Sequence, residues 1–141
     1  MQRHEDTRAE LLDKNGPLTT DEHVLSRAKL LLGTAMRRQL WFMFLDGDNI
    51  QLPLLMPTDV PRSPNNASPA DLARFIRGVI DEADASTIIV ALERRGSDEI
   101  TSDDRAWFQL VREACAMIEL PQRGPVLCHT GGVRWVAAED L

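Results

Sequence analysis

The residues that could do chemistry in this 141-residue chain gather in one charged loop, Glu93 to Asp104, with the sequence ERRGSDEITSDD. The loop carries five carboxylates, two guanidinium groups and three hydroxyl groups. Carboxylate oxygens are the ligands that hard cations such as Mg²⁺ prefer, so they predict a metal-dependent hydrolase or phosphoryl-transfer enzyme as one chemistry. The loop has no His, no Cys, no glycine-rich phosphate cradle and no Ser beside a base. Serine, thiol and P-loop mechanisms are therefore not indicated.

Two other groups of residues resemble reactive sites. Cys128 stands beside His129, but neighbours in a strand point to opposite faces, so the imidazole is badly placed to take the thiol proton. We expect an inert buried thiol there, and another at Cys115, because neither Cys has zinc or redox spacing. Asp46-Gly47-Asp48-Asn49 has the composition of a calcium loop but lacks its closing Glu, so a tight turn is predicted.

The elements on either side of the charged loop are easily recognised. Thr87 to Glu93 is almost continuously apolar and rich in β-branched residues, which is typical of a central buried strand. After the loop, Thr101 and Asp104 have capping-box spacing and predict a helix that ends before Pro121. The loop is thus expected to connect a buried strand to a capped helix, where α/β domains commonly place functional residues.

Further elements precede the strand. Ser68 and Pro69 predict the start of an amphipathic helix that ends near Ala83. Residues 39–45 and 50–56 flank the Asp46 turn and predict a hairpin, whose second strand lies at a sheet edge because Pro53 cannot donate a ladder hydrogen bond. Residues 57–67 contain three prolines and predict a connection that is either ordered or a flap.

The two ends of the chain give weaker patterns. Residues 5–15 predict a short helix, and a second helix begins with a capping box at Thr19 and Glu22, its apolar face being core or the seat of a partner helix. At the other end, Val126 to Thr130 and Val133 to Ala137 predict a hairpin around a Gly131-Gly132 turn.

These elements predict an α/β (α+β) fold with a mixed sheet. The expected order is helix, β-hairpin, helix, strand, helix, β-hairpin. Residues 1–36 form an N-terminal helical segment packed on a single domain, residues 37–141.

The charge of the chain excludes some function classes. The formal net charge is −6, and the segment from Asp81 to Asp104 accounts for it with eight acidic residues against two basic ones. An acidic chain without a basic face is poorly suited to nucleic acid, so no nucleic-acid partner is expected. The apolar runs are too short to cross a bilayer and the N-terminus lacks a signal-peptide pattern, which predicts a cytoplasmic protein without a membrane partner.

The element order and the loop resemble the MPN/JAMM metalloprotease-like fold, in particular its bacterial RadC-type domain. That family has a strand ending in His-x-His, a Ser eight positions after the second His and an Asp three positions further on. Gly96-Ser97-Asp98 is similar to the family's Ser-Gly-Asp-like turn. Ser102 falls at the serine position, while Leu92 and Arg94 stand at the histidine positions and Arg105 at the aspartate position.

A shift by one residue places Asp104 and Thr101 at the family's Asp and Ser positions, but it puts Ala91 and Glu93 at the histidines. The segment VLCHTGGVRWV also resembles the family's final strands, with Cys128-His129 where an Asp-His pair is common. The resemblance covers residues 37–141 and implies that the zinc ligands are lost. Leu92 cannot ligate a metal and Arg94 would repel one. No cofactor and no catalytic residue are therefore predicted.

Two functions remain open. The first is a non-catalytic interaction or regulatory domain whose partner is another protein or a second copy of the chain; Trp41, Trp107 and Trp135 are either part of its surface or part of the core. The second is a small metal-dependent hydrolase that uses the acidic loop, Glu93 to Asp104. The candidate pocket or interaction residues are Leu92, Glu93, Arg94, Asp98, Ser102, Asp104 and Arg105. For Arg94, we hypothesise a fixed ion pair with Glu93 or Asp98; the alternative is that Glu93, Arg94 and Arg95 are exposed charges.

Overall fold

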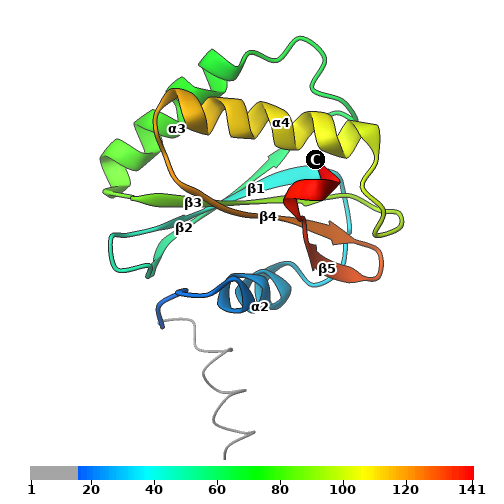
Figure 1. Ribbon diagram of the computed structural model, residues 1–141, viewed down its shortest axis with the longest axis horizontal. Coiled ribbons are helices and arrows are strands. Elements are labelled where there is room, and N and C mark those ends of the chain that lie inside the picture. Colours follow the sequence, from blue (N-terminus) through cyan, green and yellow to red (C-terminus); the bar gives the residue numbers. More distant parts are fainter. Residues whose placement is uncertain (1–15) are drawn as a thin grey trace, which may run out of the picture.

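Three layers make up the part of the chain that the computed structural model describes, residues 16–141. Two helices, α3 (Pro69–Ala83) and α4 (Ser102–Met117), cover one face of a β-sheet, and α2 (Asp21–Leu32) covers the other (Figure 1). The helix predicted at residues 5–15 lies outside the described residues.

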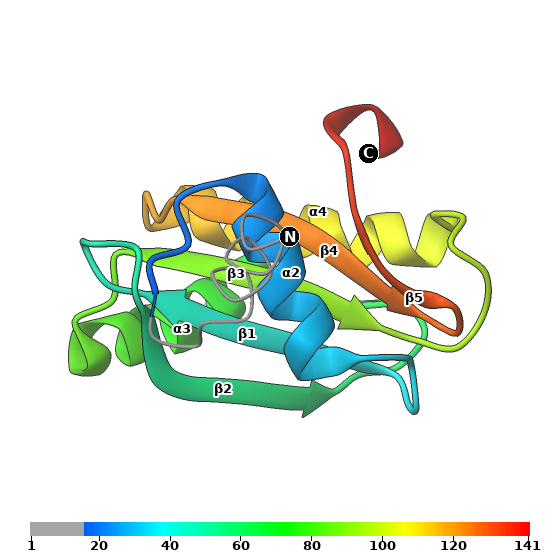
Figure 2. The same ribbon diagram turned by 90° about the horizontal axis from the view of Figure 1, so that it is seen from below.

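The sheet is mixed and open, with five strands in the described residues. They are β1 (Gln39–Leu45), β2 (Gln51–Asp59), β3 (Thr87–Glu93), β4 (Gln122–His129) and β5 (Gly132–Trp135). Their spatial order is β2-β1-β3-β4-β5, with β3 and β4 parallel and every other neighbouring pair antiparallel. Figure 2 shows this order from the side of α2, with β2 at one edge. The α/β class and the order of elements agree with the prediction, and a short 3₁₀ helix, Ala138–Asp140, follows β5.

The central strand β3 has the predicted bounds, and all seven of its residues are buried. Its side chains alternate between the two faces, as the period of two requires. Val90 and Leu92 pack in the core cluster beneath α3 and α4, whereas Ile89 and Ala91 belong to the clusters on the α2 side. Because helices cover both faces, the strand is apolar throughout rather than alternating in polarity.

Two of the three described α-helices begin at the N-cap residue that the sequence predicts. The Ser68 hydroxyl accepts a hydrogen bond from Asp71 N at the start of α3. Thr101 and Asp104 form the predicted reciprocal capping box of α4. The predicted capping box of α2 is wrong: Thr20, not Thr19, is the N-cap and accepts from His23 N. The Thr19 hydroxyl instead contacts the His23 ring.

The first hairpin is confirmed, with β2 at the sheet edge as Pro53 predicts. Asp46 Oδ1 accepts hydrogen bonds from the backbone N–H groups of Asp48 and Ile50, so these residues form a turn. The second hairpin is shifted from the prediction. Its turn is Thr130-Gly131, and Gly132 belongs to β5, where it pairs with His129.

Two hydrogen bonds between Thr130 and the charged loop explain the shifted turn. Thr130 N donates to the Gly96 carbonyl and Gly96 N donates to the Thr130 hydroxyl, at 3.1 and 2.9 Å. These two bonds hold Thr130 out of the β4–β5 ladder and against the charged loop. Gly132 then lies in an extended strand position with φ +142°, which favours glycine.

The apolar face of α2 belongs to the core. Val24 and Ala28 are buried against the sheet, where α2 contacts β4 and β5. Within residues 16–141, no helix is both long and apolar enough to cross a membrane.

Candidate functional site

The carboxyl ends of β2, β3 and β4 meet at one end of the sheet. Gln39, at the start of β1, pairs with Asp59 on one side and Glu93 on the other, and Glu93 pairs in turn with Cys128. Open α/β sheets commonly bind ligands beyond the carboxyl ends of their strands. The charged loop leaves β3 at this end, so the predicted residues stand where a site is expected.

Glu93 is buried, and both of its carboxylate oxygens are fully used by the fold. Oε2 accepts from the backbone N–H groups of Met36 and Arg37, at 2.6 and 3.1 Å. Oε1 accepts from Gln39 Nε2 at 2.7 Å and from Trp41 Nε1 at 2.9 Å. Burial raises the pKa of Glu93, but these four hydrogen bonds outweigh it and the net pKa lies below 4.5. The carboxylate therefore fixes the segment between α2 and β1.

Arg94 makes a buried ion pair with Asp104 in the first turn of α4. Its Nε lies 3.1 and 3.2 Å from the two carboxylate oxygens, and Nη2 lies 2.8 Å from Oδ2. The side chains are only 4% and 0% exposed. Such a bidentate contact matches the planar guanidinium fork to the carboxylate. The hypothesis of a fixed ion pair is thus right for Arg94, but its partner is Asp104, not Glu93 or Asp98.

The Gly96-Ser97-Asp98 turn wraps around the Arg94 guanidinium. Nη1 donates to the Ser97 carbonyl at 2.6 Å, and Nη2 donates to the Glu99 carbonyl at 2.7 Å. Gly96 has φ +125°, and a Cβ atom there would lie 3.1 Å from Arg94 Nη1. Glycine is needed both for the left-handed conformation and for this close approach. The turn is a binding pocket for the protein's own arginine.

Asp104 serves the ion pair and the helix cap together. Its Oδ2 also accepts from Thr101 N at 3.0 Å, while Asp104 N donates to the Thr101 hydroxyl at 3.1 Å. Burial raises the pKa of Asp104, but the hydrogen bonds from Arg94 and Thr101 and the charge of Arg94 give a net lowering. We call Glu93, Arg94 and Asp104, with their partners, the sealed polar cluster. The alternative that Glu93 and Arg94 are exposed charges is wrong, and only Arg95 of the three is exposed.

The remaining predicted residues do not join this cluster in one cavity. Leu92 is fully buried in the core beneath α4. Ser102 and Asp98 are exposed. Arg105 donates to the carbonyls of Asp140 and Ile100, so it fixes the C-terminal 3₁₀ helix. Among residues 16–141, no three His, Cys, Asp or Glu side chains converge in a way that could hold a metal ion.

The two cysteines are buried thiols, as predicted. Burial raises the pKa of Cys115 to about 11, and burial together with the Glu93 charge raises the pKa of Cys128 to about 11. His129 accepts a hydrogen bond from Gly131 N through its ring Nδ1. The Cys128 thiol points instead toward the Gly33 carbonyl, 3.8 Å away. A thiolate nucleophile activated by His129 is not supported by this geometry.

A second feature at the same end of the sheet is an apolar cavity of about 600 Å³, here called the α3–α4 cavity. Leu40 and Phe42 of β1 form its floor, and side chains of α3 and α4 form its walls. The segment after β2 closes one side: Trp107 Nε1 donates to the carbonyls of Pro61 and Arg62, both at 3.1 Å. The predicted connection 57–67 is wrong at its start, because residues 57–59 belong to β2. Of the two alternatives for the rest, an ordered connection is supported, because Trp107 ties Pro61 and Arg62 to α4.

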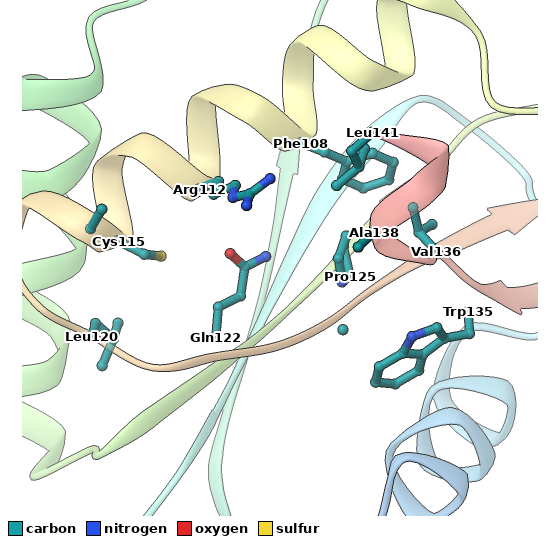
Figure 3. A pocket seen from close by; sticks show the side chains of 12 residues that line it. Phe108, Arg112, Cys115, Leu120, Gln122, Pro125, Trp135, Val136, Ala138 and Leu141 are labelled. Atoms are coloured by element: carbon teal, nitrogen blue, oxygen red, sulfur yellow. The ribbon is translucent and has the colours of Figure 1, made fainter.

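A smaller cavity of about 500 Å³ lies on the other side of α4. It is enclosed by α4, β4 and the C-terminal residues (Figure 3). Figure 3 shows the Arg112 and Gln122 side chains reaching into it from opposite walls, with the Cys115 sulfur also facing inward. This cavity is more polar than the α3–α4 cavity.

The sequence predicts the helices and the first strand of the hairpin that line the α3–α4 cavity, but not the cavity itself, and residues 58–61 and Ala67 of its lining fall in the segment predicted as a connection. Leu72 and Phe75 lie on α3 and Trp107 and Leu110 on α4, two helices that the sequence predicts. The space between them depends on the distance between α3 and α4 above β1, which periodicity does not encode. The exposure of Phe75 is seen only in the structure, because the sequence pattern does not show which apolar residues of a helix reach solvent.

Comparison with known proteins adds no assignment. No protein-family model matches this chain. A search of curated proteins likewise gave no match.

Proposed function

We propose that this chain is a non-catalytic interaction or regulatory domain. The observation that carries the proposal is the full use of Glu93 and Asp104 within the fold. Between them these carboxylates accept hydrogen bonds from two side-chain N–H groups, three backbone N–H groups and the Arg94 guanidinium. Both carboxylates are buried and hydrogen-bonded to groups of the fold, which makes them poorly available to a metal or a substrate, so the two most deeply placed acids of the loop act as structural groups.

We further propose that the domain is a degenerate MPN/JAMM-like module. The order helix, hairpin, helix, strand, helix, hairpin supports this proposal, as does the turn after β3. In that alignment Arg94 stands at a metal-ligand position, and its guanidinium supplies the positive charge that the surrounding carbonyls and carboxylate require. The fold would thereby keep the scaffold of a metal site with an internal cation in place of zinc.

The proposed partner is another protein or a second copy of the chain, in the cytoplasm. Five large apolar side chains are exposed on different parts of the fold: Leu30, Met36, Ile50, Phe75 and Met117. Single exposed apolar residues are ordinary on a protein surface, so experiment decides which partner binds. Sedimentation equilibrium over a hundredfold concentration range tests the self-association branch. A monomer at every concentration would remove the second copy from the proposal.

Metal retention and turnover test the non-catalytic proposal directly. Protein purified without chelator is incubated with Mg²⁺, Mn²⁺ or Zn²⁺, desalted and analysed for bound metal, then assayed with an aryl phosphate and an unfolded polypeptide. We expect no stoichiometric metal and no turnover.

The other three acids of the loop supply the matched variant. Asp98, Glu99 and Asp103 carry the loop carboxylates outside the sealed polar cluster. One equivalent of metal together with turnover that is lost in Asp98→Asn/Glu99→Gln/Asp103→Asn would overturn the proposal in favour of the metal-dependent hydrolase.

A further inference from the structure

The α3–α4 cavity has the size and lining of a small-molecule site. Its volume of about 600 Å³ falls in the range of roughly 300–1,000 Å³ that is typical of ligand pockets. Most of its lining is apolar, and it includes Phe42, Leu72, Phe75, Trp107 and Leu110. Three aromatic side chains and two leucines favour an apolar or aromatic ligand body of similar size.

Phe75 shows that this apolar surface reaches solvent. Phe75 is 45% exposed although it belongs to the apolar residues of α3 that line the cavity. Its neighbour on α3, Ile76, is completely buried. Covering the exposed part of Phe75 and the cavity walls behind it would remove apolar area from water, which is favourable at about 25 cal/mol per Å².

The charged residues of the lining are both acids. Asp59 ends β2 and Asp71 lies in the first turn of α3, so the two stand on different elements of the cavity wall. Asp71 contacts Arg74 at 3.3 Å, but that pair is exposed on both sides and holds the carboxylate weakly. No side-chain partner of Asp59 is found within residues 16–141. Thr58 and Ser68 add two hydroxyl oxygens to the lining.

This combination of an apolar interior and carboxylate oxygens selects the chemistry of the occupant. We propose that the α3–α4 cavity binds a small amphipathic amine, with an apolar or aromatic body between α3 and α4 and a protonated nitrogen beside Asp59 and Asp71. A cation is favoured over an anion by the two carboxylates, and the face of an aromatic side chain also attracts it. The inference goes beyond the proposed function, because such a site needs neither a metal nor a protein partner.

The position of the cavity supports a ligand site rather than a packing defect. It lies where β2 ends and β1 begins, at the end of the sheet toward which β3 and β4 also run. The segment that closes it is held by Trp107 and by the bond from Val60 N to the Arg38 carbonyl, at 3.5 Å. The site is therefore preformed on one side by two strands and two helices and bounded on the other by a loop.

Three eight-carbon probes of different charge test the proposal: octylammonium, octanol and octanoate, at pH 7. Binding is followed by ¹H–¹⁵N spectra of the whole chain, with the Trp107 indole N–H as the reporter inside the cavity. We expect octylammonium to bind at least about fivefold more tightly than octanol, and octanoate to bind most weakly, since one or two exposed charge contacts are worth roughly a factor of five.

Variants distinguish the contribution of the two carboxylates to binding from that of the apolar space. Asp59→Asn/Asp71→Asn is expected to bring octylammonium to the affinity of octanol, while Asp81→Asn, which removes an exposed acid from α3 outside the cavity, leaves the preference unchanged. Leu72→Trp fills the space and is expected to abolish binding of all three probes. If that variant is unfolded, shifts confined to Phe75, Trp107 and Leu110 in the unmodified chain serve the same purpose.

Other outcomes would overturn the proposal. Octanoate binding as tightly as octylammonium would show that the carboxylates do not select the ligand. Shifts spread over the acidic surface, or no binding of any probe, would show that the cavity is not a site for amines. Shifts at the cavity that grow with protein concentration in the absence of a probe would identify a second copy of the chain as its occupant.

Discussion

At the carboxyl end of β3, Glu93 and Arg94 lie within the fold, Glu93 hydrogen-bonded to neutral donors and Arg94 paired with Asp104. Beside the end of β2, in contrast, the walls of the α3–α4 cavity remain partly open to solvent. The two regions are separated only by the start of β1, since Gln39 pairs with Glu93 on one side and Asp59 on the other. One region is polar and sealed; the other is apolar and accessible.

The difference indicates that the two regions at this end of the sheet have different roles. Buried charges are tolerated only when paired and hydrogen-bonded, and such a network then holds loops in place at the expense of reactivity. The sealed polar cluster fixes the segment before β1, the turn after β3 and the first turn of α4. The apolar side chains on the cavity wall need no charged or hydrogen-bonding partner. The cluster thus supports the structure, and the cavity is the region that we propose for ligand recognition.

Removing Arg94 should have the largest effect on stability. Arg94→Met leaves Asp104 buried without its cation and frees the Ser97 and Glu99 carbonyls. We expect a loss of about 3–5 kcal/mol in the free energy of unfolding, measured by urea titration, because an uncompensated buried charge is costly.

Two controls make that prediction specific. Arg95→Met removes an exposed neighbour and should change stability by no more than about 0.5 kcal/mol. Arg94→Met/Asp104→Leu removes both charges and should be more stable than Arg94→Met alone. A loss of less than about 1 kcal/mol in Arg94→Met would mean that the cluster is not sealed, contrary to the comparison.

The Glu93 network should give the next largest effect. In Glu93→Gln one carboxylate oxygen becomes an NH₂ group that faces N–H donors, either Met36 and Arg37 or Gln39 and Trp41. We expect a loss of about 2–3 kcal/mol, since buried donors are left without an acceptor. Glu99→Gln, in an exposed part of the same loop, should be nearly neutral in the same urea titration.

Lowering the pH should test the buried carboxylates Glu93 and Asp104 in the unmodified protein. The pKa values of Glu93 and Asp104 are lowered in the folded protein from the ordinary 4.5 and 3.8. A carboxyl group whose pKa falls on folding contributes stability that is complete above its unfolded pKa and is lost as the pH drops toward its folded pKa. Urea midpoints should therefore decline below about pH 4.5, and Glu93→Gln should decline less steeply. An equally steep decline in both proteins would show that Glu93 is not the linked group.

Local patterns predicted the scaffold better than the site. The bounds of β3 and the cap of α4 were predictable because an apolar β-branched run and the spacing of Thr101 and Asp104 are local signals. The partner of Arg94 was not, since Asp104 is ten residues away and is selected by how α4 packs over β3. The four donors to Glu93 come from more than fifty residues upstream and have no signature near it. The turn at Thr130 was missed for the same reason: Gly96 fixes it from another loop.

A smaller effect is expected where the loop joins the cavity. Trp107→Phe keeps a ring between α3 and α4 but loses the hydrogen bonds to Pro61 and Arg62. We expect about 1–2 kcal/mol of destabilisation and faster proteolytic cleavage between residues 60 and 67. Trp135→Phe, which removes an indole from a half-buried position outside the α3–α4 cavity, controls for the change of ring. Cleavage rates that stay the same in Trp107→Phe would mean that the indole does not hold the loop.

The smallest effect on stability should come from Phe75, and it decides between the two interpretations of the cavity. Because Phe75 is 45% exposed, Phe75→Ala removes only about half of the buried area of a core Phe and should cost no more than about 1.5 kcal/mol, whereas Ile76→Ala, one residue away and fully buried, should cost about 2–5 kcal/mol. If the cavity is a binding surface, Phe75→Ala should nevertheless weaken octylammonium binding several-fold. Equal losses of stability in Phe75→Ala and Ile76→Ala, measured by urea titration, would make Phe75 part of the core. The contrast between a sealed cluster and an open cavity would then disappear, because both regions would serve stability alone.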